Sequence, residues 1–166
     1  MEFIQKNKVY IIIGLLIVSI ITAIIICTSL LKPSSDDTTY DINSTFYPTL
    51  KISGELLDDK LNGYTVIESE NNDFKLTGTF KDGVFKEGNI SLINKNVEYY
   101  LEGSFNNFNL QEGDITIITE DKIITKSGFF IDNKLDGTGF IKIQDKQTGE
   151  VLFNYAGKFE NDKPIY

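Results

Sequence analysis

A short pattern recurs five times in the last two-thirds of the chain at nearly constant spacing. Each repeat reads Gly-x-(aromatic or Leu), followed five residues later by Leu, Phe or Pro. The repeats begin at Gly54, Gly78, Gly103, Gly128 and Gly157, in steps of 24, 25, 25 and 29 residues. A fixed period of about twenty to fifty residues is typical of proteins whose units pack mainly on their neighbours. We therefore predict a repeat architecture for this part of the chain.

Each repeat has the pattern of one β-hairpin. Apolar and polar residues alternate in segments such as 89–93 and 114–118, which is the period of a half-buried strand. Short polar segments separate the strands and have the composition of turns. The predicted turns of this kind are 70–73, 94–96, 120–121 and 145–149. The sequence therefore predicts an all-β fold, an elongated antiparallel meander of about five stacked hairpins, with no helix after residue 35.

A second set of turns follows each leading glycine by five residues. The residues at this position are Asp59, Gly83, Phe108, Asn133 and Asp162. Gly, Asn and Asp adopt a left-handed backbone more readily than other residues, whereas Phe does not. We therefore expect a different turn at Phe108. Glycines inside strands predict close approach of neighbouring hairpins, with the aromatic residue of one repeat lying over the glycine of another.

The fourth repeat carries Gly128, Phe130, Gly137 and Gly139 at spacings that resemble the MORN repeat (membrane occupation and recognition nexus). That pattern reads approximately Tyr-x-Gly-x-aromatic, then a turn, then Gly-x-Gly. The other repeats are more degenerate, and the last ends like a capping half-repeat. The resemblance covers residues 50–166. It implies stacked β-hairpins and an association with assembly and membrane-proximal organisation.

Residues 9–31 form an uncharged run of 23 residues, of which 15 are Ile, Leu or Val. As a helix this run is about 34 Å long, which is enough to cross a hydrocarbon core of about 30 Å. Lys6 and Lys8 precede the run and Lys32 follows it, so the basic residues favour a cytoplasmic N-terminus. We predict cytoplasmic residues 1–8, one transmembrane helix over 9–31 and an extracytoplasmic remainder at the plasma membrane.

A cleaved signal peptide is the alternative interpretation of this run. The apolar core of a signal peptide normally has about 7–15 residues and ends at a site of small residues. The run here is longer, and its candidate site at 27–29 contains Cys and Thr. An uncleaved anchor is therefore favoured.

The exported part divides into a linker at 32–49, which has loop composition, and a repeat domain at 50–166. Residues 32–166 contain 14 Lys and 23 Asp or Glu, a net charge of −9, and the chain has no Arg. This charge opposes binding to nucleic acids and to anionic headgroups. The single cysteine, Cys27, lies in the apolar run, so the repeat domain has no disulfide. The abundance of Lys, Asn and Ile without Arg is typical of an AT-rich bacterial genome.

The recurring aromatic positions have two interpretations, an aromatic groove for a ligand or a row of core residues, and the second is favoured. The predicted scaffold residues are Gly54, Gly78, Phe80, Gly103, Phe105, Gly128, Phe130, Gly137, Gly139, Gly157 and Phe159. Partner contacts are expected on the opposite face and in the last hairpin. The candidates for these contacts are Tyr64, Tyr99, Tyr100, Phe108 and Tyr166.

No catalytic, cofactor-binding or metal-binding residue is predicted. The chain has no His, its exported part has no Cys, and no Ser lies in a nucleophile-elbow sequence. A pair of glycosidase carboxylates requires a cleft, which an open meander rarely forms. The acidic turns at 58–59, 71–73 and 120–121 lack the alternating ligands of a calcium loop and are expected to be solvated. We therefore predict that the chain is not an enzyme.

The sequence favours a membrane-anchored extracytoplasmic module that binds or scaffolds proteins at the cell envelope. An exposed edge strand at 159–166 could dock a partner or a second copy of the chain. Direct binding of a cell-wall glycan or lipid headgroup is one alternative. An accessory subunit that acts through its transmembrane helix is another.

Overall fold

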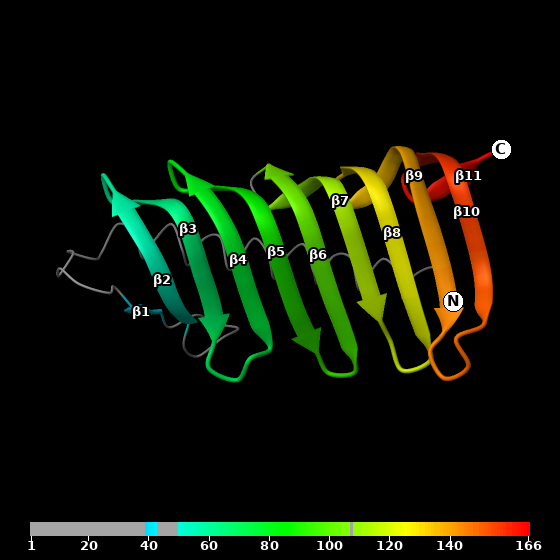
Figure 1. Cartoon of the computed structure of the whole chain (residues 1–166), viewed down its shortest axis with the longest axis horizontal. Helices are drawn as coiled ribbons and strands as arrows, with labels where there is room; N and C mark the ends of the chain where they lie inside the picture. The colour runs from blue at the N-terminus through cyan, green and yellow to red at the C-terminus, as the bar shows by residue number, and fades with distance from the viewer. Residues whose placement is uncertain (1–38, 43–49, 107) are drawn as a thin grey trace.

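The computed structural model describes residues 39–42, 50–106 and 108–166, which form one antiparallel sheet of eleven strands (Figure 1). Each strand from β2 to β10 pairs with the strands before and after it in the sequence, and β1 and β11 are the two end strands, so the sheet is a simple meander. Within these ranges the structure contains strands and turns but no helix. The strands are β1 (Thr39–Ile42), β2 (Leu50–Leu57), β3 (Lys60–Ser69), β4 (Phe74–Lys81), β5 (Val84–Asn94), β6 (Val97–Asn106), β7 (Asn109–Ile118), β8 (Lys122–Ile131), β9 (Lys134–Asp145), β10 (Val151–Glu160) and β11 (Lys163–Ile165).

The all-β antiparallel meander predicted from the repeats is confirmed. The segment 32–49, predicted to be a linker, contains a strand that the sequence did not predict. This strand, β1, pairs with β2 from Thr39↔Ser53 to Ile42↔Leu50. The predicted transmembrane run at 9–31 lies outside the described residues. Among the residues that are described, no helix is long and apolar enough to span a membrane.

Each repeat forms one hairpin whose two strands are joined by a two-residue loop along one long edge of the sheet. In the first of these loops Asp58 and Asp59 have φ values of 50° and 58°. Positive φ at both central residues is the type I′ geometry that matches the twist of the flanking strands. Phe108 has φ 66°, so the expectation of a different turn there is wrong. Stacking of the Phe108 ring on Phe85, at a centroid distance of 5.6 Å, offsets the strain of this backbone.

A line of facing glycines crosses the sheet from β4 to β10. The strand register places each glycine opposite the next, and the members are Gly78, Gly88, Gly103, Gly113, Gly128, Gly139 and Gly157. We call this row the glycine line. The backbones approach so closely that a Cβ atom on Gly103 would lie 2.8 Å from the Cα atom of Gly113 and would collide with the Glu112 carbonyl oxygen.

The glycine line belongs to the face that carries the core, here called the inner face. A row of large apolar residues lies beside the line, at the positions of Phe80, Phe85, Phe105, Phe130 and Phe159, all of which are buried. The Phe159 ring of the fifth repeat lies over Gly139 of the fourth, as predicted for an aromatic residue and a glycine of different repeats. The Phe85 ring, in contrast, lies over Gly78 of its own repeat. The rings of Phe85 and Phe105 are 4.7 Å apart, so this row continues from one hairpin to the next.

On the other side of the glycine line, the inner face carries aliphatic rows. Ile67, Leu76, Ile90 and Leu101 are neighbours across four strands, and all four are buried. Burying one such side chain contributes about 1.5–3 kcal/mol. The same row contains one basic residue, Lys126, which lies opposite Ile115 and Ile141. The repeat therefore places its glycine, aromatic and aliphatic positions on one face.

Replacement of Gly103 with alanine should destabilise the fold by at least about 4 kcal/mol, because its Cβ atom would separate β6 from β7. Gly149→Ala is the control. Gly149 also has a positive φ, 73°, but no atom lies within 4 Å of the position that a Cβ atom would occupy there, so the expected cost is about 1–2 kcal/mol. Urea unfolding of the full-length protein measures both. Equal losses in the two variants would contradict the close-approach argument.

Candidate binding surfaces

The two faces of the sheet differ sharply in what they expose. Residues that alternate with the inner-face rows form the outer face, where Tyr64 is 67% exposed and Tyr100 is also exposed. Tyr99 and Phe108 were expected to be exposed as well, but both are buried, and this expectation is corrected. Tyr99 lies between Leu92 and Ile117 in an inner-face row, and Phe108 packs on Phe85.

Tyr166 lies at the end of the last hairpin and is almost fully exposed. Its ring packs edge-on against Tyr155 at a centroid distance of 5.4 Å. The Tyr155 hydroxyl also donates a 2.7 Å hydrogen bond to the carbonyl oxygen of Ile165. Tyr155 therefore holds the short strand β11 against β10, and Tyr166 is a surface residue of this corner.

The outer face contains a hollow between β4 and β7, and the volume of this hollow is about 250 Å³. Two cross-strand rows form the hollow. The first is Lys75–Ser91–Tyr100–Thr116 and the second is Thr77–Asn89–Glu102–Asp114. Tyr100 stands between the much smaller Ser91 and Thr116, and it is 40% exposed. We call this site the outer hollow.

The charges of the outer hollow are unbalanced. Glu102 lies directly opposite Asp114 on the same face, and like charges in directly opposed positions destabilise a sheet. Lys75, which also lines the hollow, is 3.3 Å from the carboxylate of Glu68. The two opposed carboxylates therefore make the hollow a negatively charged surface.

Tyr100 supplies a neutral hydrogen-bonding group in the outer hollow. Its hydroxyl donates a 2.7 Å hydrogen bond to Glu98. This hydrogen bond raises the pKa of Tyr100, and burial and the charge of Glu98 raise it further. The phenol therefore stays protonated at physiological pH and presents an aromatic ring with a polar tip.

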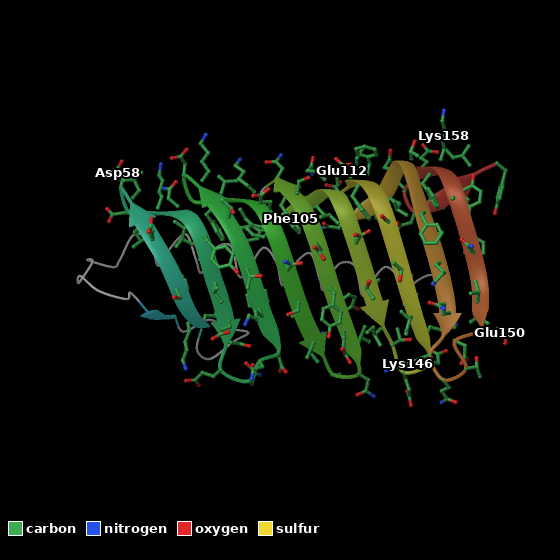
Figure 2. All side chains as sticks on the ribbon, in the orientation of Figure 1. Asp58, Phe105, Glu112, Lys146, Glu150 and Lys158 are labelled. Carbon is green, nitrogen blue, oxygen red and sulfur yellow. The ribbon has the colours of Figure 1, made fainter. Side chains whose placement is uncertain are left out.

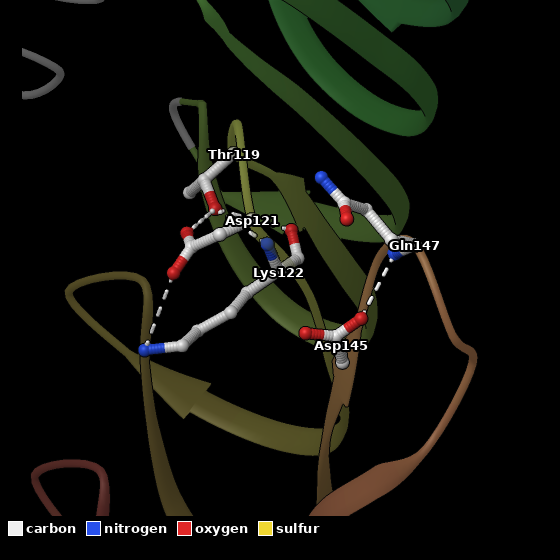
Figure 3. Close-up of polar contacts among 5 residues, drawn as sticks. All are labelled: Thr119, Asp121, Lys122, Asp145 and Gln147. Carbon is white, nitrogen blue, oxygen red and sulfur yellow. Dashed lines mark hydrogen bonds and ion pairs between the residues drawn. The ribbon is translucent and has the colours of Figure 1, made fainter.

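The two-residue loops lie along one long edge of the sheet, and longer turns lie along the other. Acidic residues in these longer turns stabilise them (Figure 3). Asp121 accepts a 3.0 Å hydrogen bond from the Thr119 hydroxyl. Asp145 accepts hydrogen bonds from the backbone N–H groups of Gln147 and Thr148, at 3.0 and 2.8 Å. The Thr148 contacts lower the pKa of the Asp145 carboxyl, because they stabilise its charged form. Figure 2 shows Lys146 at this edge and Asp58 at the other.

The two-residue loops connect each hairpin to the one before it. Gly83 N–H donates to the carbonyl oxygen of Leu61 at 2.9 Å, and Asp162 N–H donates to that of Leu135 at the same distance. The side chains of Asn133 and Asp162 accept from the N–H groups of Leu110 and Leu135, at 2.9 and 2.8 Å. These equivalent contacts fix how successive hairpins stack.

The last loop also neutralises the basic residue of the inner face. Lys126 Nζ lies 2.7 Å from Asp162 Oδ2, and the Lys126 side chain is almost completely buried. Removing one partner of a buried ion pair leaves an uncompensated charge, which is strongly destabilising. Asp162 therefore couples the fifth hairpin to the fourth through both backbone and charge.

The end of the sheet has an open edge on β10 in addition to the one predicted from the sequence. β11 pairs with β10 only at Lys158, Phe159 and Glu160. In the described part of the chain, residues 151–157 of β10 pair with β9 on one side and with no strand on the other. The sequence placed the exposed edge at 159–166. Within this range β11 is the last strand of the sheet, whereas the backbone of β10 from 158 to 160 is covered by β11.

Two of these surfaces were not identified from the sequence. The outer hollow depends on which residues meet across four strands, and the open edge depends on where β11 stops pairing. A sequence signal for the hollow exists, because Glu102 and Asp114 directly adjoin glycines of the glycine line. Among the residues that the structure describes, no group of three or more His, Cys, Asp or Glu could hold a metal ion.

A scan against models of known protein families finds no match to the chain. A search of curated proteins also finds no matching sequence.

Asp162→Asn tests the buried ion pair. Asparagine keeps the left-handed turn and the acceptor oxygen for Leu135 N–H but removes the charge that neutralises Lys126. We expect a loss of about 3 kcal/mol in urea unfolding of the full-length protein. The double variant Lys126→Met/Asp162→Asn should recover most of that loss, because no buried charge remains. A double variant no more stable than Asp162→Asn alone would contradict this role.

Proposed function

We propose that this chain is a membrane-anchored module that presents its repeat sheet outside the cytoplasm and binds proteins at the cell envelope. The uncharged run at 9–31 supplies the anchor, and the lysines around it favour a cytoplasmic N-terminus. The chain acts by binding and not by catalysis. This proposal draws on the chemistry of the exposed groups, which are carboxylates, amides, hydroxyls and a phenol.

The outer hollow is the observation that carries this proposal. The repeated residues of the inner face are buried against one another, so they are not accessible to a partner. The outer-face residues that line the hollow differ from strand to strand, and five of these eight residues are exposed. Small side chains beside Tyr100 leave room for a partner's side chain, and exposed aromatic residues are enriched in protein interfaces.

The charge of the hollow favours a partner with lysine or arginine on its surface. A cationic group placed between Glu102 and Asp114 would remove their mutual repulsion. The net charge of −9 on residues 32–166 would also attract such a partner over longer distances. Binding of this kind weakens as the salt concentration rises.

We also propose that the repeats are of the MORN type. Five hairpins of similar length, the glycine line and the aromatic row support this proposal. MORN-type repeats would account for the elongated shape, which offers a long surface for assembly (Figure 1). The repeat type by itself does not select the partner, so the outer hollow is the place to test the function.

The double variant Glu102→Gln/Asp114→Asn should reduce partner capture at least tenfold. The experiment crosslinks the full-length tagged protein in native membranes and identifies captured proteins by mass spectrometry. Glu55→Gln/Glu160→Gln is the control, because it removes two exposed charges from distant strands. Equal capture by both double variants would show that the hollow does not bind the partner.

Binding to a cell-wall glycan is a second candidate, favoured by the exposed Tyr100 ring and its neighbouring hydroxyl groups. A neutral glycan would bind independently of salt and would depend on Tyr100 more than on the two carboxylates. Cosedimentation of the full-length protein with purified cell wall, lost in Tyr100→Ala and retained in Glu102→Gln/Asp114→Asn, would replace the protein-binding proposal with this one.

An accessory subunit that acts through its helix predicts a different result. Replacing residues 9–31 with an unrelated transmembrane segment would then abolish partner capture. Under our proposal the replacement leaves capture intact.

Protease added to intact cells should also degrade the repeat domain, because we place it outside the membrane. Protection of the domain in intact cells, with cleavage only after lysis, would overturn this orientation.

A further inference from the structure

We propose that two copies of this chain pair edge to edge through β10 and form a symmetric dimer with one continuous sheet. The proposal rests on the scaffold function above and names a second copy as one of its partners. The pairing surface is the open edge of β10, residues 151–157, which lies at one end of the sheet (Figure 1).

The open edge lacks the usual protection against pairing with another strand. Edge strands expose unpaired N–H and C=O groups, and proteins normally protect them with Lys, Pro or very short strands. Residues 151–157 read Val-Leu-Phe-Asn-Tyr-Ala-Gly and contain no charged residue and no Pro. This neutrality contrasts with the net charge of −9 on residues 32–166. Two copies can therefore approach at this edge without local charge repulsion.

The side chains at the open edge are apolar and exposed. Val151 and Leu152 are each 50% exposed, and Phe153 is 36% exposed. Phe153 lies opposite Ile143 of β9 on the inner face, so it forms the outermost member of an apolar row. A strand added beside Phe153 would continue that row and remove its ring from water.

The sequence of the edge is self-complementary in antiparallel pairing. With the two-fold axis at Asn154, this residue meets Asn154 of the second copy, and Phe153 meets its Tyr155. Leu152 meets Ala156 in the same register. A two-fold axis perpendicular to the sheet keeps both inner faces on one side, so the aromatic pairs form on the inner face and the amides on the outer face. The identity of the residues thus favours a second copy over an unrelated strand.

Two features limit the length of the paired region. A bulge between Val151 and Phe153 interrupts the regular ladder at one end. The Tyr155–Ile165 hydrogen bond and Tyr166 hold β11 at the other end. The new ladder therefore spans about residues 152–156, so we expect a weak and reversible dimer. Anchoring both copies in one membrane would raise their effective concentration.

Disulfide trapping tests the register. Asn154→Cys in a Cys27→Ser background places two cysteines directly opposite each other, where Cα atoms in an antiparallel pair are about 4.5–5.5 Å apart. This distance is within the range of disulfides. Mild oxidation of membranes that contain the full-length variant should give a crosslinked dimer. Asn89→Cys in the same background is the control, because Asn89 is exposed on an interior strand. Equal crosslinking of both variants would overturn the proposal.

A charge variant tests the same edge without a covalent bond. Asn154→Lys would place two ammonium groups against each other at the two-fold axis, and we expect the dissociation constant in detergent to rise at least tenfold by analytical ultracentrifugation. Gln111→Lys, at an exposed position of the interior strand β7 outside the hollow, should leave this constant unchanged. If Asn154→Lys abolishes capture of another protein while Asn154→Cys forms no dimer, the edge belongs to that protein and our proposal is wrong.

Failure of the dimer can be distinguished from failure of the scaffold function. The double variant Glu102→Gln/Asp114→Asn lies three or more strands from β10 and should leave Asn154→Cys crosslinking unchanged. Loss of crosslinking in that background would show that the trapped dimer does not form through β10 alone and would overturn the proposal. Retained crosslinking with lost partner capture would support two separate interfaces.

Discussion

Backbone contact along the glycine line determines how closely the strands approach and which residues the sheet buries. At Gly103 and Gly113 neighbouring strands approach so closely that neither residue can carry a Cβ atom. The missing side chains leave space on the inner face, and that space is filled by Phe85, Phe159 and their equivalents. The aromatic rows can therefore pack on the backbone itself. A sheet with larger residues on this line would have to hold its aromatic side chains away from the strands, where water could reach them.

The loop contacts convert this local packing into a regular stack. Asn133 and Asp162 each reach back to the preceding hairpin, to Leu110 and Leu135. In the third repeat Phe108 occupies the corresponding position and lacks a side-chain acceptor. It packs instead on Phe85 of the preceding hairpin, which is an apolar contact in the place of a polar one. The stack therefore tolerates different chemistry at this position, provided that the turn residue contacts the hairpin before it.

The sequence was sufficient to predict the all-β antiparallel meander, because period-two alternation and the repeated glycines act within and between adjacent strands. It was less informative where a tertiary contact overrides a local preference. Phe108 adopts the left-handed turn because its ring gains a stacking partner, and Tyr99 is buried because its strand register places it in an inner-face row. The outer hollow could not be located in advance, because it depends on four strands meeting in one register. The open edge likewise follows from the short pairing of β11.

The contrast between the two faces indicates which positions of the repeat can vary without disturbing the core. On the inner face, the leading glycine and the large apolar residue two positions after it recur in successive repeats, because each must fit against its neighbour. On the outer face, the residues directly before Gly78, Gly103 and Gly128 are Thr77, Glu102 and Ser127, so a carboxylate stands in one repeat where two others have a neutral hydroxyl. Backbone packing constrains these positions only to point away from the core. These positions can therefore differ according to what the outer face contacts. The directly opposed carboxylates Glu102 and Asp114 are unfavourable for the sheet alone. Under our proposal, a partner that supplies a positive charge would offset this repulsion.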